Sequence, residues 1–333
     1  MTNRPDFQVD EGNPQTHAIA HFKPNKGYDS YCNPMDYKGL DGGGGDTKNN
    51  SGLKDEEEVA MHKKISEKQI KELQSNMSKR DHQVLDAIRR CRYLTTWQVK
   101  RLHFVDSVTP TAGLRAANRC LRRLKGLGLI GTLKRRIGGV RAGSGSYVWY
   151  LEAAGERFIC LTDNTVKPRK RCFEPSPRFL SHTLAVAECF VQMNEICRED
   201  ELKLMTVELE PECWREYSVA GKIVTLKPDL SAVTVCGNYE DRWFFEMDLN
   251  TEAPIKVIEK CQRYHQYYRC GLEQKQYGVF PLTAWIVPDE SRKDTLISHI
   301  KAEFSSQVNI FVVITPDELP ILIRQYLDGK ALC

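Results

Sequence analysis

The chain has 333 residues, of which 41% are hydrophobic and 28% are charged, so it has room for about two folded domains. No apolar run approaches the about 20 residues of a membrane-spanning helix, and the polar N-terminus lacks a signal-peptide core. We therefore expect a cytoplasmic protein without membrane insertion. The twelve cysteines include no Cys-x-x-Cys pair, which argues against zinc fingers and a disulfide framework.

The formal net charge of +4 conceals a strongly basic segment. Between Lys79 and Arg141, sixteen Lys and Arg residues face three Asp and no Glu, a net charge of +13, which leaves −9 for the rest of the chain. Such a concentration of positive charge is typical of a surface that binds a polyanion. The segment is therefore a candidate nucleic-acid-binding region.

The first part of the chain has few clustered apolar residues. Residues 1–54 are rich in Gly, Asn, Asp and Pro, and four glycines follow one another from Gly42 to Gly45. Such a composition cannot offset the entropy of ordering, so it predicts a disordered arm. Residues 55–77 are highly charged with sparse apolar positions, which predicts a solvated lead-in helix.

Residues 78–165 show the element order of a winged helix-turn-helix domain, which is three helices followed by a β-hairpin. Ser78 is predicted to cap the first helix, and Thr95 or Thr96 the second. A Gly-Leu-Gly run beginning at Gly126 ends the third. The predicted elements are helices 78–92, 97–104 and 111–125, strands 129–133 and 146–151 around a basic loop, and a helix at 153–159.

The third helix has an apolar face and a basic face, as a helix lying in the DNA major groove would have. Arginines in the following loop would reach flanking phosphates or the minor groove. Any one arginine is more often solvated than in contact with a base, but their density on helix and loop favours double-stranded DNA as a partner. The candidate DNA-binding residues are Arg115, Asn118, Arg119, Arg122, Arg123, Lys134, Arg135, Arg136 and Arg141.

Residues 166–177 form a basic, proline-marked segment that predicts an exposed linker. The remainder, 178–333, alternates helical and strand patterns and predicts a mixed α/β domain. Its predicted elements are a helix at 179–197, strands at 202–209, 230–236 and 242–249, a helix at 254–268, a strand at 282–287, a helix at 291–304, a strand at 310–314 and a helix at 317–327.

Carboxylates lie on two neighbouring strands of this region. Glu246 and Asp248 alternate with apolar residues, so both point to one face of a strand. A turn at 237–240 would pair this strand with the one that Asp229 opens, so that three carboxylates converge. Two charges about 4 Å apart repel by roughly 4 kcal/mol at a partly buried site. Such a cluster is tolerable only if a cation or shared protons neutralise it, and a hard divalent metal ion is the preferred neutraliser.

This arrangement resembles a known fold and a known family. Helix, three strands, helix and strand, with Pro-Asp on one strand and a carboxylate motif on the next, resemble the PD-(D/E)xK restriction-endonuclease-like fold. Together with the preceding winged helix, the chain resembles the replication-relaxation family of bacterial mobile elements, which includes MobC-type plasmid relaxases. The resemblance rests on Tyr150–Gly155, His182–Glu188, Lys227–Asp229, Phe244–Asp248, Lys260 and Tyr264. It implies an α/β (α+β) protein, a winged helix-turn-helix domain followed by a nuclease-like mixed α/β domain.

The resemblance also implies metal-dependent cleavage of one DNA strand at an origin of transfer or replication. Asp229 and Glu246 would hold Mg²⁺ or Mn²⁺, with Glu188 as a further ligand. Asp248 stands where the usual motif has Lys, so the cationic role falls to Lys260, one helical turn from Tyr264. Were a covalent intermediate formed, the candidate nucleophiles would be Tyr264, Tyr267 and Tyr268.

Two other functions fit the same residues. The missing motif lysine favours a catalytically inactive DNA-binding regulator of replication or transcription. A defence nuclease that makes double-strand breaks is a third reading. From the family resemblance we also expect a bacterial, plasmid- or mobile-element-encoded protein, with a relaxosome accessory protein and a coupling ATPase as partners.

Overall fold

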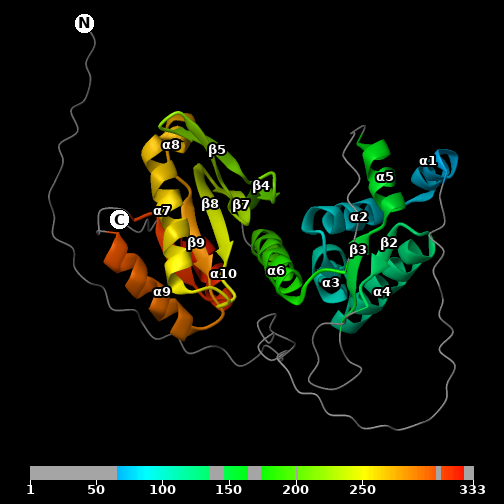
Figure 1. Ribbon diagram of the computed structural model, residues 1–333. Coiled ribbons are helices and arrows are strands. Elements are labelled where there is room, and N and C mark those ends of the chain that lie inside the picture. Colours follow the sequence, from blue (N-terminus) through cyan, green and yellow to red (C-terminus); the bar gives the residue numbers. More distant parts are fainter. Residues whose placement is uncertain (1–65, 135–145, 164–173, 200–201, 305–308, 326–333) are drawn as a thin grey trace, which may run out of the picture. The chain divides into compact units, whose positions relative to one another are not determined.

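The computed structural model of the protein describes residues 66–134, 146–163, 174–199, 202–304 and 309–325, all of which belong to one compact unit. These residues form mixed α/β structure, as the sequence predicted (Figure 1). The predicted arm at 1–54, residues 55–65 of the lead-in segment and most of the linker lie outside the described ranges, as do Arg135, Arg136 and Arg141. None of the described helices combines the length and the apolar character that crossing a bilayer requires.

Four helices open the described chain, and a side-chain cap begins each of them, the first cap being Ser66. The Ser78 hydroxyl accepts from the Asp81 amide and the Thr95 hydroxyl from the Gln98 amide, which confirms both predicted caps. Thr109 caps the fourth helix, where Pro110 stands at its first position. The elements are α1 (Glu67–Asn76), α2 (Lys79–Cys91), β1 (Leu94–Thr95), α3 (Thr96–His103) and α4 (Pro110–Gly126).

A small antiparallel sheet follows these helices. Strand β3 (Val148–Leu151) lies between β1 and β2 (Ile130–Thr132), and α5 (Ala153–Thr162) comes next. The three helices, the two later strands and the following helix come in the predicted order, whereas strand β1 was not predicted. The loop that would form the wing lies outside the described residues, so the winged-helix assignment stays a prediction.

The rest of the chain is built on a five-stranded sheet with the order β10-β9-β8-β7-β4. Strands β4, β7 and β8 are antiparallel, whereas β8, β9 and β10 run parallel. The predicted order of helix, three strands, helix and strand is confirmed. The elements are α6 (Pro177–Glu199), β4 (Lys203–Leu209), β7 (Leu230–Cys236), β8 (Tyr239–Met247), α7 (Pro254–Cys270), α8 (Leu272–Tyr277), β9 (Leu282–Ile286), α9 (Glu290–Glu303), β10 (Phe311–Ile314), the 3₁₀ turn Pro316–Glu318 and α10 (Leu319–Gln325).

The two faces of this sheet are covered by different helices (Figure 1). Trp243 and Phe245 of β8 belong to the core that contains α6 and α10. Phe244, between them, packs with Tyr264 of α7, and α9 packs against α7 and β10. Since neighbouring strand residues point to opposite faces, even-numbered β8 positions face α7. This alternation decides where the carboxylates lie.

One hairpin was not predicted from the sequence. Strands β5 (Arg215–Val219) and β6 (Lys222–Leu226) form a separate two-stranded sheet between β4 and β7 in the chain. Ala220 and Gly221 have φ values of +48° and +78°, which a tight two-residue hairpin turn requires. The alternation in these short strands was the available signal, and the polar residues among them obscured it.

Candidate active site

The hairpin of β7 and β8 brings two of the predicted carboxylates together. Leu230 pairs with Phe245, so Asp229, one residue earlier, lies opposite Glu246. Gly237, with φ +57°, makes the tight turn that fixes this register. Both carboxylates are buried, with exposed fractions of 4% for Asp229 and 1% for Glu246. Asp229 and Glu246 therefore lie next to each other on neighbouring strands, as the sequence predicted.

Asp229 is held by three groups from three elements. Its Oδ2 accepts the Met247 amide hydrogen at 2.7 Å, which ties it to the end of β8. Its Oδ1 lies 3.4 Å from Nε2 of His182 on α6 and 3.8 Å from Nζ of Lys260 on α7. One carboxylate oxygen is thus anchored to the backbone, while the other faces cationic side chains.

Glu246 has a similar division between its two oxygens. Oε2 forms an ion pair with Lys260, and Oε1 accepts the Tyr264 hydroxyl hydrogen at 2.5 Å. Lys260 and Tyr264 are four residues apart on α7, so they occupy one face of that helix. The Lys260 ammonium therefore lies beside both carboxylates, in the place for which the sequence proposed a replacement lysine.

Burial and charge act in opposite directions on this cluster. Burial raises the pKa of Glu246 to about 8, against the attraction of Lys260. For Asp229, the penalty of burial is outweighed by Lys260, His182 and the Met247 amide, which lower its pKa to about 2. Burial disfavours the charged form of Lys260, but the two carboxylates raise its pKa above the ordinary value. The pair therefore contains one stable anion and one carboxyl group that is ready to lose a proton near neutral pH.

This difference predicts a pH dependence of stability. Between pH 4.5 and about 8, folded Glu246 keeps a proton that it loses on unfolding. The free energy of unfolding should consequently fall as pH rises through this range, because the folded state binds the proton that the unfolded state has lost. Glu246→Gln should remove most of that fall, as urea denaturation at pH 5.5 and pH 8 would measure. The exposed Glu216→Gln is the control, and parallel pH curves for wild type and Glu246→Gln would contradict the assignment.

The donor set fits a hard divalent cation. Each carboxylate has one oxygen fixed by a protein donor and a second oxygen directed toward a positive charge. Mg²⁺ is commonly held by one or two carboxylates, with water and substrate phosphate completing its shell. Within the described residues, no group of three or more His, Cys, Asp or Glu side chains is placed to hold a metal ion. A site made by Asp229 and Glu246 would therefore depend on oxygens from outside the protein's side chains.

Asp248 does not join the pair, so the expected convergence of three carboxylates is wrong. Strand β8 ends at Met247, and the buried Asp248 forms a 2.6 Å ion pair with Nε of Arg292 on α9. Arg292 also donates to the backbone oxygen of Glu252. Asp248 thus stabilises the junction between β8 and α9. It lies two residues beyond Glu246, the residue that faces Lys260.

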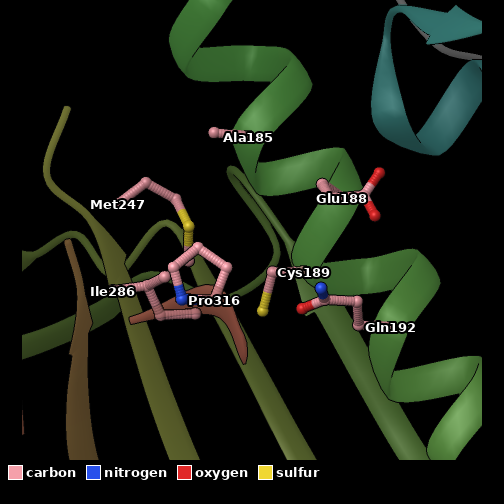
Figure 2. A pocket seen from close by; sticks show the side chains of 7 residues that line it. All are labelled: Ala185, Glu188, Cys189, Gln192, Met247, Ile286 and Pro316. Carbon is pink, nitrogen blue, oxygen red and sulfur yellow. The ribbon is translucent and has the colours of Figure 1, made fainter. Parts of the chain in front are cut away.

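Glu188 is also placed away from the pair. Arg101 of α3 forms ion pairs with Glu188 and Glu195, and Gln98 donates to Glu188 at 3.0 Å. Figure 2 shows the Glu188 carboxylate pointing away from the side chains of Met247 and Pro316 in a small, mostly apolar pocket beside α6. The structure accordingly gives Glu188 a role in holding α3 to α6 and supplies no contact between it and Asp229 or Glu246.

The tyrosines named as nucleophile candidates differ in their surroundings. Tyr264 is fully buried with its hydroxyl on Glu246, and burial together with Glu246 raises its pKa well above the ordinary value. Tyr267 is buried and donates to Glu273 at 2.8 Å. Tyr268 is partly exposed and packs edge-on against Phe280. Tyr264 and Tyr267 are therefore poorly placed to attack a phosphodiester.

The basic face of α4 is only partly available for binding. Arg115, Arg119 and Arg122 are exposed and have no ion pair within the described part of the chain. Arg123, in contrast, forms an ion pair with the buried Asp81. The remaining described candidates are Asn118, whose amide donates to the Leu114 carbonyl within the helix, and Lys134, which is exposed.

His182 is the site residue to which sequence reasoning gave no role. It belongs to the segment that carried the family resemblance, but the helical pattern alone did not indicate where its ring points. The start of α6 lies next to the start of β7, so the ring reaches Asp229. Attraction by Asp229 outweighs burial and raises the pKa of His182.

Comparison with known proteins identifies the family. The model of the family described as replication-relaxation matches residues 85–283, more than half of the 333-residue chain. The match includes α3 to α8, both carboxylates, Lys260 and Tyr264. No curated protein and no solved structure matches the chain. The chain belongs to the replication-relaxation family.

Proposed function

We propose that this protein is a metal-dependent endonuclease that nicks one strand of double-stranded DNA at an origin of transfer or replication. Membership of the replication-relaxation family supports a role in the replication or mobilisation of plasmids or other mobile elements. The observation that carries the proposal is the convergence of Asp229, Glu246 and Lys260 at one buried position. Such a combination of two carboxylates and one lysine suits phosphodiester hydrolysis.

The chemistry is divided among the side chains. A bound Mg²⁺ or Mn²⁺ would polarise a phosphate oxygen and lower the pKa of an attacking water. Asp229 and Glu246 would hold that ion, for which Glu246 must first release its proton. Lys260 would orient the attacking water and stabilise negative charge on the phosphate. Tyr264 fixes one oxygen of Glu246, so it is a positioning residue in this scheme.

Tyr264 and Tyr267 are buried, and the partly exposed Tyr268 packs against Phe280, which favours hydrolysis over a tyrosine adduct. A covalent route would require Tyr264 to leave both Glu246 and the core that surrounds it. The expected products are therefore a nicked strand and a protein free of attached DNA.

A DNA-binding regulator with an inactive nuclease-like region is the second candidate. Its support was Asp248 in the position of the usual lysine. That support weakens because Asp248 pairs with Arg292, while Lys260 supplies a cation from α7 to the carboxylate pair. The accessory protein and the coupling ATPase remain proposed partners.

Relaxation of a supercoiled plasmid that carries the element's own origin tests the proposal. With Mg²⁺ or Mn²⁺, wild type should convert supercoiled plasmid to the open circle. Asp229→Ala and Glu246→Ala should lose this activity while still retarding origin DNA in a gel. Absence of relaxation with any divalent metal would favour the regulator, and a linear product would favour a defence nuclease.

A further inference from the structure

A hollow in the protein surface adjoins the carboxylate pair. Asp229 and His182 line it together with Glu210, at the end of β4, and with Arg90 and Arg92, at the end of α2. Residues from the basic N-terminal segment and from the five-stranded-sheet region therefore share one hollow. An extended polymer bound at Asp229 would pass these side chains.

The two arginines are held very differently. Arg90 donates to the Val207 carbonyl oxygen, and its guanidinium lies 5.0 Å from the centre of the Phe190 ring. Arg92 is partly exposed and has no ion pair or side-chain hydrogen bond with any described residue. Arg90 is thus fixed within the fold, whereas the Arg92 guanidinium keeps its donors available for a ligand.

The backbone of Arg92 is also unusual. It ends α2 with φ 64° and ψ −46°, in a region where glycine is favoured and a side chain is strained. Strain of this kind is concentrated at sites of function, where the surrounding structure holds the strained conformation. Glycine would fit the turn better, so an arginine here indicates a use for the guanidinium.

We propose that Arg92 binds a phosphate of the DNA strand that lies at Asp229 and Glu246. A guanidinium matches phosphate with paired hydrogen bonds, and Arg92 has these donors unused. Glu210 would repel the same strand, which makes a cation on this wall more necessary. The inference rests on the proposed nuclease function for the identity of the ligand. It makes Arg92 a binding residue contributed by the basic N-terminal segment.

Binding to a fluorescent twelve-nucleotide thymidine strand, measured by anisotropy in EDTA at several salt concentrations, tests the inference without cleavage. Arg92→Gly should weaken binding about 5-fold at 0.1 M salt and reduce the slope of log K against log salt by about 0.7, the value for one phosphate of a single strand. Its Tm should equal or exceed that of wild type, because glycine relieves the strained φ. Arg92→Lys should retain most of the salt slope, since the charge remains.

Arg269→Ala, which removes an exposed arginine of α7, is the matched control and should change neither affinity nor slope. The inference is overturned if Arg92→Gly binds as wild type does, if its loss of affinity accompanies a lower Tm, or if wild type does not bind the strand. Failure of the nuclease proposal is distinguishable. In that case plasmid relaxation is absent while the Arg92-dependent binding in EDTA persists.

Discussion

Replacement of Lys260 by Met should make the stability of the protein depend on divalent cations. Lys260 is the ammonium beside both Asp229 and Glu246, and its removal leaves a buried anion without that partner. Breaking a buried ion pair typically costs about 3–5 kcal/mol. A cation that binds the folded carboxylates would restore about 2.7 kcal/mol at a concentration 100 times its Kd. Thermal unfolding with and without Mg²⁺ or Mn²⁺ measures both effects.

The same substitution should lower the nicking rate by at least about 100-fold, because one preorganised charge at the reacting phosphate is lost. Lys256→Met provides a matched control on α7, since Lys256 is an exposed lysine paired with Glu259. That variant should resemble wild type in unfolding and in nicking. A Lys260→Met protein that is as stable as wild type, and indifferent to divalent cations, would contradict a cation-binding role for the pair.

Asp248→Asn should unfold more readily by about 3–5 kcal/mol, while the fraction that remains folded nicks DNA at nearly the wild-type rate. Asp248 is 5% exposed and pairs with Arg292, so the substitution leaves a guanidinium buried without its charge partner. Urea denaturation gives the loss of stability. Nicking per folded molecule separates this structural role from the catalytic role that the sequence motif indicated.

Arg292→Met should destabilise the protein by a similar amount. The double variant Asp248→Leu with Arg292→Met should lose less than the sum of the single variants, because no charge is left unpaired. If Asp248→Asn instead abolishes nicking while stability is unchanged, Asp248 acts in the chemistry and the structural assignment is wrong.

Local pattern was sufficient for the site wherever its partners are close in sequence. Alternation in β8 placed Glu246 on one face, and the tight turn at Gly237 set Asp229 opposite it. Lys260 and Tyr264 lie on the helix that follows β8, and their spacing of four residues puts both on one side. These features come from the periods of strand and helix, which the sequence displays directly.

The remaining site residues depend on partners that are distant in sequence. Asp248 pairs with Arg292, 44 positions later, and Glu188 pairs with Arg101, 87 positions earlier. Both carboxylates looked available because nothing in their own segments reveals these arginines. The contact between His182 and Asp229 likewise depends on how α6 docks on the sheet, which hydrophobic periodicity does not determine.

Helix α6 has a consequence for any attempt to use the protein in pieces. Leu180 and Leu184, near its start, pack with Tyr93 and Val148 of the preceding segment, while residues further along it belong to the core of the five-stranded sheet. A cut at the linker would expose the apolar side chains at the start of α6. A cut after α6 would expose the face of the five-stranded sheet that α6 covers. Neither fragment keeps a complete hydrophobic core. A fusion of the basic segment to another enzyme would therefore need new residues on the exposed face of this helix.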